Sequence, residues 1–216
     1  MEYLTAVVVV DIQKDFTTAF NGSIAVNGTD QAYLKLVSEA TDKLKDVGLP
    51  IYATQDWHPS DHISFASNHK GKNPLETIIL EDGRTQVLWP DHCVQGSDGA
   101  KLLLDEKLIT GIVQKGANSK YDSYSGFQDD GGAKTILDKT LKSTGIKNLI
   151  VYGIATDYCV KFTVLNGMAA GYNVLVVRDL TPEIAPDTAK AAWAEMEKKG
   201  ASIWSSLDIA KVKNLP

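Results

Sequence analysis

Apolar residues along the chain follow two alternating patterns. In one, they form short runs rich in valine and isoleucine, which is typical of buried parallel strands. In the other, they recur every three or four positions, which is typical of helices with one buried face. This alternation predicts a doubly wound α/β fold, with a mostly parallel six-stranded sheet and helices on both faces. The expected strands span residues 5–10, 50–54, 111–114, 149–154, 173–177 and 201–204, and the expected helices span residues 30–47, 100–108, 132–144, 160–170 and 188–199.

Length and composition indicate one globular domain over residues 1–216, since 44% of the residues are hydrophobic and 23% are charged. The net charge of −5 argues against a nucleic-acid or anionic-membrane partner. No apolar run approaches the ~20 residues of a membrane span, and no signal sequence is recognisable. We therefore expect a cytoplasmic protein that acts on a small molecule, with Cys93 and Cys159 both reduced. The sequence is compatible with a homo-oligomer and does not fix the oligomeric state.

Ionisable or reactive residues follow five of the six expected strands. They are Asp11, Asp56, Lys115, Cys159 and the pair Arg178–Asp179. Each has an ordinary explanation, because aspartate often caps an element and lysine is usually solvated. In parallel sheets, however, ligands bind beyond the carboxyl ends of the strands. The convergence of four reactive residue types at one edge therefore predicts a catalytic rim.

Cys159 lies where a strand should end and a helix begin. Backbone N–H groups and the dipole at a helix N-terminus stabilise a thiolate, so this position suits a nucleophile. A buried core thiol is the alternative. No histidine is expected beside Cys159, which leaves Asp11 as proton acceptor and Lys115 as the stabilising cation. The alternative for these two is a structural Asp–Lys ion pair.

All four histidines fall in the long connection after the second strand, which we assign as an insertion over residues 57–97. Asp56 and His58 are two residues apart, so in extended backbone they point to the same side. With a distant histidine they suit Zn²⁺, Fe²⁺ or Mn²⁺. Hydrogen-bonded loop histidines are the alternative, but connections this long are usually functional. His69 lies in a polar stretch and is expected at the surface.

Three aromatic residues cluster near the same rim: Phe16, Trp89 and Tyr124. They would form a slot for a flat ring or, alternatively, ordinary core.

These motifs together resemble the nicotinamidase/pyrazinamidase branch of the isochorismatase-like cysteine hydrolases. The resemblance covers nearly the whole chain and implies that family's Rossmann-type fold. Five ordered stretches carry it: 10–16, 56–59 with 62–65, 88–94, 115–116 with 122–127, and 153–160.

The resemblance implies a role for each member of the catalytic set. Cys159 would attack the carboxamide carbon of nicotinamide, Asp11 would take the thiol proton, and Lys115 would hold the charged pair. A cis peptide at Ile154–Ala155 would turn the N–H of Ala155 alongside that of Cys159 to form an oxyanion hole.

The resemblance also implies a metal and a ring site. Asp56, His58 and His92 would bind one divalent ion, with zinc first and iron or manganese as alternatives, and the ion would hold the pyridine nitrogen. His62 would be either a ligand or an outer-shell residue. Phe16, Trp89 and Tyr124, together with Ile154, would contact the substrate.

The leading hypothesis is hydrolysis of nicotinamide to nicotinate and ammonia in NAD salvage, with pyrazinamide as a further expected substrate. One alternative is a related cysteine amidohydrolase acting on an acyclic amide or ureido compound. The other is a metal- or ligand-binding protein without enzymatic activity.

Overall fold

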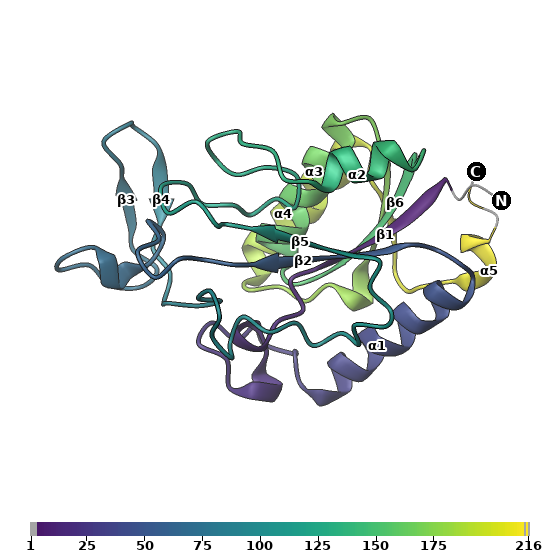
Figure 1. The fold of residues 1–216 in the computed structure, drawn as a ribbon, viewed down its shortest axis with the longest axis horizontal. Helices are drawn as coiled ribbons and strands as arrows, with labels where there is room; N and C mark the ends of the chain where they lie inside the picture. The colour runs from purple at the N-terminus through teal and green to yellow at the C-terminus, as the bar shows by residue number, and fades with distance from the viewer. Residues whose placement is uncertain (1–3, 214, 216) are drawn as a thin grey trace.

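Six parallel strands form the central sheet of the protein, in the order β5-β2-β1-β6-β7-β8 (Figure 1). The computed structural model describes residues 4–213 and residue 215. The predicted α/β fold with a six-stranded sheet is confirmed. The strands are β1 (Thr5–Val10), β2 (Ile51–Asp56), β5 (Gly111–Lys115), β6 (Asn148–Gly153), β7 (Asn173–Val177) and β8 (Ser202–Trp204).

Helices cover both faces of this sheet (Figure 1). One face carries α1 (Gln31–Asp46) and α5 (Ile209–Val212), and the other carries α2 (Leu137–Ser143), α3 (Lys161–Ala169) and α4 (Pro186–Lys199). Because both faces are covered, every residue of β1, β2 and β6 is buried. Among the described residues, no helix is long and apolar enough to cross a membrane.

Residues 100–108 were expected to be helical, and that prediction is wrong. Leu102 instead forms an antiparallel bridge with Gln13, and the N–H of Leu103 donates to Ile12 O at 2.8 Å. Residues 101–103 therefore run extended beside residues 12–14, because these long-range backbone hydrogen bonds replace the ones a helix would supply, and residues 105–108 form a turn.

The helix expected over residues 132–144 begins only at Leu137. A tight loop takes the preceding residues. The carboxylate of Asp129 accepts a hydrogen bond from Ala133 N at 2.8 Å, and Lys134 pairs with Gln128 in an isolated bridge. Side-chain capping of this kind competes with helix formation.

The connection between β2 and β5 projects from the sheet and carries a two-stranded hairpin, β3 (Thr77–Ile79) and β4 (Thr85–Val87) (Figure 1). Its two ends return to each other, because His58 N donates to Cys93 O at 3.0 Å and Gln95 N donates to His58 O at 2.8 Å. Residues at opposite ends of this long connection therefore meet beside the carboxyl ends of the strands.

The order of strands along the chain reverses at the middle of the sheet. The chain enters at β1, adds β2 and β5 on one side, and then returns to place β6 on the other side of β1. Ligands of open α/β sheets bind where the strand order reverses in this way. The loops after β1 and β6 are therefore the expected place for a site.

Candidate active site

Strand register brings three of the predicted catalytic-rim residues together. Asp56 and Lys115 are paired directly across β2 and β5. Val10 pairs with Gly153 across β1 and β6, so Asp11 leaves the sheet beside Ile154. Because parallel strands end at one edge, these side chains meet below a common pocket.

The ammonium group of Lys115 is the centre of this cluster. Its Nζ lies 2.9 Å from Asp11 Oδ2 and 2.5 Å from Asp56 Oδ1. It also donates to Cys159 Sγ at 3.4 Å and to Ser123 O at 2.9 Å. Burial lowers the pKa of Lys115, but the charges of Asp11 and Asp56 outweigh burial and hold that pKa well above its usual value. Lys115 is therefore a permanent cation between two carboxylates and a thiol.

Asp11 is fixed by a residue that the sequence analysis did not single out. The hydroxyl of Thr54 donates to Asp11 Oδ1 at 2.6 Å and accepts from Asp11 N at 3.1 Å. Asp11 is fully buried and has a left-handed backbone conformation, with φ 49°. Burial raises the pKa of Asp11 despite the opposing charge of Lys115. The carboxylate is consequently a stronger base than an exposed aspartate.

Cys159 lies in a π-helical turn, Thr156–Val160, that leads directly into α3. The sequence predicted a thiolate stabilised by the helix end. Burial instead raises the pKa of the Cys159 thiol well above its usual value, although the charge of Lys115 opposes this. Desolvation of the charged form outweighs the local dipole. The resting residue is a protonated thiol that needs a neighbouring base.

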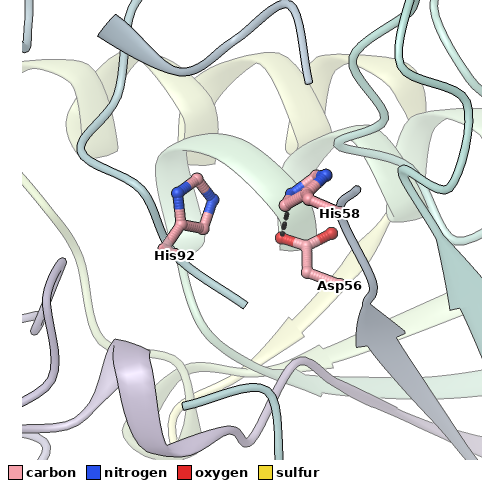
Figure 2. Close-up of side chains that lie close together, drawn as sticks. All are labelled: Asp56, His58 and His92. Atoms are coloured by element: carbon pink, nitrogen blue, oxygen red, sulfur yellow. Dashed lines mark ion pairs between the residues drawn. The ribbon is translucent and has the colours of Figure 1, made fainter. Parts of the chain in front are cut away.

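A second group of side chains suits a divalent metal ion. The ligand atoms of Asp56, His58 and His92 all lie within 4.8 Å of one another, and Figure 2 shows the three side chains facing a common space. His58 Nδ1 is 3.0 Å from Gly116 O and His92 Nδ1 is 2.7 Å from Pro90 O. Each carbonyl accepts the Nδ1 proton, which leaves both Nε2 atoms as ligands. The donor set fits the ion.

Two of the three side chains in this group have pKa values that suit metal binding, whereas burial lowers the pKa of His58 but the charge of Asp56 outweighs burial and raises that pKa. Burial raises the pKa of Asp56, but Lys115 and His58 outweigh burial and hold that pKa below its usual value. Burial, followed by the charge of His58, lowers the pKa of His92. Asp56 is therefore ionised and His92 neutral, the forms in which these side chains bind metal.

His62 is held away from the metal ligand set by its own hydrogen bonds. Its Nδ1 lies 2.7 Å from Ser64 Oγ and accepts from Ser64 N at 3.3 Å, while its Nε2 lies 3.2 Å from Tyr121 O. Burial and the charge of His58 lower the pKa of His62 to about 4. Both ring nitrogens of His62 are therefore occupied by hydrogen bonds. His69, which bonds to Ile63 O, is half-buried rather than fully at the surface.

A pocket of about 450 Å³, including its opening, joins the two groups. The expected ring-contact residues Phe16, Trp89, Tyr124 and Ile154 all line it, as do Ala155 and Cys159. Trp89 Nε1 donates to the hydroxyl of Tyr124 at 3.0 Å, which fixes two of the aromatic walls. The pocket is thus mostly apolar, with polar groups at one end.

The peptide bond between Ile154 and Ala155 is cis, as the family resemblance implied. Three N–H groups of the following turn have backbone acceptors: Thr156 N donates to Pro182 O, and Tyr158 N and Val160 N donate to Ala155 O. The turn that carries Cys159 is therefore tied down on both sides.

Five residues that line the pocket were not singled out by the sequence analysis, the polar Asp122 and Tyr158 and the apolar Ile24, Val26 and Ile184. Tyr158 packs edge-on against Trp89, with ring centroids 5.1 Å apart. Asp122 is buried and accepts from Ser123 N and Gln86 Nε2, both at 2.8 Å, and from the hydroxyl of Tyr124. The position of Tyr158 directly before Cys159 was a usable signal, whereas nothing local marked Asp122.

The pair Arg178–Asp179, expected at the same rim, lies elsewhere. Arg178 stacks over the ring of Trp193 on α4, with the guanidinium carbon 4.4 Å from the ring centroid. Neither residue of the pair lines the pocket.

Comparisons with known proteins agree with this geometry. Residues 5–208 match the isochorismatase domain family. The chain is 43% identical over 208 residues to the nicotinamidase of Escherichia coli strain K12, covering 94% of this chain and 95% of that protein.

Solved structures give the same family of neighbours. A nicotinamidase/pyrazinamidase of Acinetobacter baumannii superposes with a TM-score of 0.86 and 36% identity, covering 97% of this chain and 98% of that one. A pyrazinamidase of Pyrococcus horikoshii in complex with zinc superposes with a TM-score of 0.77 and 33% identity, covering 94% of this chain and 99% of that one.

Proposed function

The chain belongs to the isochorismatase family, and we propose that within this family it is a metal-dependent cysteine amidohydrolase that converts nicotinamide to nicotinate and ammonia. Similarity to nicotinamidases over most of the chain supports this substrate. Nicotinate produced in this way would enter NAD salvage, and pyrazinamide, a related ring carboxamide, is the second substrate we expect.

One observation carries the proposal: a buried thiol and a metal-type ligand set line the same apolar pocket. Cys159 lies beside Lys115, and Asp56, which also pairs with Lys115, belongs to the ligand set with His58 and His92. A substrate with a reactive carbonyl and a ring nitrogen meets both groups at once. Nicotinamide has this combination on a flat ring, which the aromatic walls suit.

In the first step, the Cys159 sulfur would attack the carboxamide carbon while Asp11 takes the thiol proton. The raised pKa of Asp11 favours this transfer. The carbonyl oxygen becomes an oxyanion, to which the N–H groups of Ala155 and Cys159 would donate. A single donor of this kind typically contributes about 3 kcal/mol to the transition state. Lys115 keeps its charge and stabilises the ionised carboxylate and sulfur.

In the second step, the C–N bond breaks and the proton on Asp11 passes to the departing nitrogen, which leaves as ammonia. The product is a thioester on Cys159. Asp11, now ionised again, would remove a proton from water as that water attacks the thioester. Nicotinate leaves and the thiol of Cys159 is restored, so no external oxidant or reductant is needed.

Asp56, His58 and His92 would hold the divalent ion, and zinc is the ion we propose, with iron and manganese as alternatives. When bound, the ion would supply a Lewis-acid contact to the pyridine nitrogen and so orient the ring. The zinc complex of the Pyrococcus horikoshii relative supports this choice. Phe16, Trp89 and Tyr124 would restrict the ring from the sides.

The test is an ammonia-release assay with nicotinamide and pyrazinamide, with and without added metal. Cys159→Ala should abolish turnover. Cys93→Ala is the matched control, because Cys93 is the other buried free thiol and lies outside the pocket lining. Full activity in Cys159→Ala would rule out the mechanism.

The choice of substrate distinguishes nicotinamide hydrolysis from the alternative of an amidohydrolase that acts on a ureido compound. Faster turnover of an N-carbamoyl amino acid than of nicotinamide would favour it, whereas no ammonia from any amide would favour a binding protein. The aromatic walls and the ligand set argue for nicotinamide, because an acyclic substrate needs neither.

A further inference from the structure

Lys115 lies inside a second set of side chains that is able to bind a metal ion. Ligand atoms of Asp11, Asp56 and Cys159 all lie within 4.8 Å of one another. All three side chains are buried. The Lys115 Nζ lies between them, 2.9 Å from Asp11 Oδ2, 2.5 Å from Asp56 Oδ1 and 3.4 Å from Cys159 Sγ. The ammonium therefore occupies the place where a cation bound by these ligands would lie.

Asp11 adds an independent sign that this position suits a cation. Among the described residues its Oδ2 has no hydrogen-bond partner of good geometry, and the contact that this oxygen makes is the ion pair with Lys115 at 2.9 Å, whereas Thr54 donates to the other oxygen, Oδ1. A buried carboxylate oxygen without a donor is rare and costly. Such an oxygen is a ready ligand for a metal ion if the ammonium is absent.

Asp56 belongs to both sets. Its Oδ1 faces Lys115, and its Oδ2 lies 3.6 Å from His58 Nε2 on the side of the proposed metal site. One carboxylate thus separates two adjacent cation positions. In two-metal enzymes the ions lie about 3.5–4 Å apart. A second ion in the Lys115 position would complete a similar arrangement.

A second ion there would stop the proposed reaction. Thiolate is a soft ligand that zinc and similar ions bind strongly, and coordination removes the thiol proton. The sulfur electron pair needed for attack on a carbonyl would be held by the ion. A nucleophilic thiol beside a metal site therefore needs protection from the metal.

We propose that Lys115 gives this protection: its ammonium fills the Asp11–Asp56–Cys159 position and confines the metal to Asp56, His58 and His92. The tethered charge repels an entering cation and satisfies the ligands that would bind it. This role is additional to holding the charged pair during catalysis. It rests on the metal site of the proposed function but not on its substrate.

Cobalt(II) is the probe, because thiolate-to-cobalt charge transfer reports directly on sulfur coordination. Wild-type protein should bind one equivalent, without the charge-transfer band. Lys115→Met keeps the length of the side chain and removes its charge. This variant should bind two equivalents by equilibrium dialysis and should gain the band.

Two matched variants show whether the second ion binds because the charge of Lys115 is lost and whether Cys159 is its ligand. Lys115→Arg retains the charge and should stay at one equivalent without the band. Lys115→Met combined with Cys159→Ala should lack the band. A charge-transfer band in the wild type, or one equivalent and no band in folded Lys115→Met, would overturn the proposal.

If Lys115→Met fails to fold, the proposed role of Lys115 is tested on the wild-type protein. Alkylation of Cys159 by iodoacetamide should proceed at a similar rate in zinc-loaded and metal-free protein. Loss of alkylation on zinc loading would show that the ion reaches the thiol and would refute the protective role. None of these measurements uses nicotinamide, so their outcome is separable from that of the ammonia-release assay.

Discussion

Replacing Thr54 by valine removes one hydroxyl that makes two hydrogen bonds to Asp11. The hydroxyl donates to Asp11 Oδ1 at 2.6 Å and accepts from Asp11 N at 3.1 Å. Both residues are fully buried, so no water replaces the lost contacts. Valine has nearly the same shape as threonine, so the change removes the polar contacts and leaves the packing in place.

The expected loss of stability follows from these two contacts. A hydrogen bond to a charged group contributes about 1.5–3 kcal/mol, and an unsatisfied buried donor costs about 1–3 kcal/mol. We expect Thr54→Val to destabilise the protein by about 3 kcal/mol. For a protein of this size that lowers the Tm by roughly 6–12 °C, which thermal unfolding followed by circular dichroism measures.

The effect on activity has a definite sign. The hydrogen bond from Thr54 lowers the pKa of Asp11, so its removal raises that pKa further. Asp11 must be ionised to take the thiol proton. The acid limb of kcat/KM for nicotinamide should therefore move to higher pH in Thr54→Val. Rates measured above the limb should change much less than rates measured below it.

Thr41→Val is the matched control. Thr41 is also fully buried, and its hydroxyl makes two hydrogen bonds, with Val37 O at 2.7 Å and Tyr152 OH at 2.8 Å. These contacts lie away from the pocket, so Thr41→Val should lose stability without moving the acid limb. An unchanged limb in Thr54→Val, or one that moves to lower pH, would refute the role given to Asp11.

Three further changes test other parts of the site. Asp122→Asn places an amide donor among the groups that donate to Asp122, which include the Tyr124 hydroxyl. KM for nicotinamide should therefore rise about 10-fold or more while kcat changes less. A fall in kcat alone would contradict this prediction. His62 has a folded pKa of about 4 against 6.5, so its stabilising effect is full above pH 6.5 and is lost as pH falls toward 4. Urea unfolding should show the advantage of wild type over His62→Asn shrinking by about 3 kcal/mol across that range, and a constant difference would be inconsistent with a neutral His62. Dialysis against a chelator should raise KM for nicotinamide and leave Cys159 open to iodoacetamide, whereas an unchanged KM would exclude a role for metal in holding the ring.

The catalytic residues were predictable because they follow from strand ends. Asp11 directly follows β1, Lys115 is the last residue of β5, and Cys159 lies in the turn after β6, and parallel strands deliver their carboxyl ends to one edge. The ligand set of Asp56, His58 and His92 was harder to predict. The two ends of the long connection that carries it meet only through backbone hydrogen bonds.

The wrong predictions share a physical cause: contacts between residues far apart in the sequence outweighed the local sequence pattern. Residues 100–108 have helix-compatible spacing, but their backbone pairs with residues 12–15. Cys159 has the local setting of a stabilised thiolate, but burial raises its pKa. The contacts of Thr54 and Asp122 were not predicted, because they depend on side-chain directions in the folded protein.

The position of β6 beside β1 has a consequence for the order in which the protein matures. Asp56, His58 and His92 all precede β6 in the chain, whereas Cys159 follows it. During synthesis the proposed metal ligands emerge before the proposed nucleophile, Cys159. A ribosome-bound chain that ends before β6 would therefore carry the complete proposed ligand set and lack Cys159. Catalysis begins only when the last third of the chain docks against the first strand, so recovery of ammonia release during refolding reports the final assembly of the sheet.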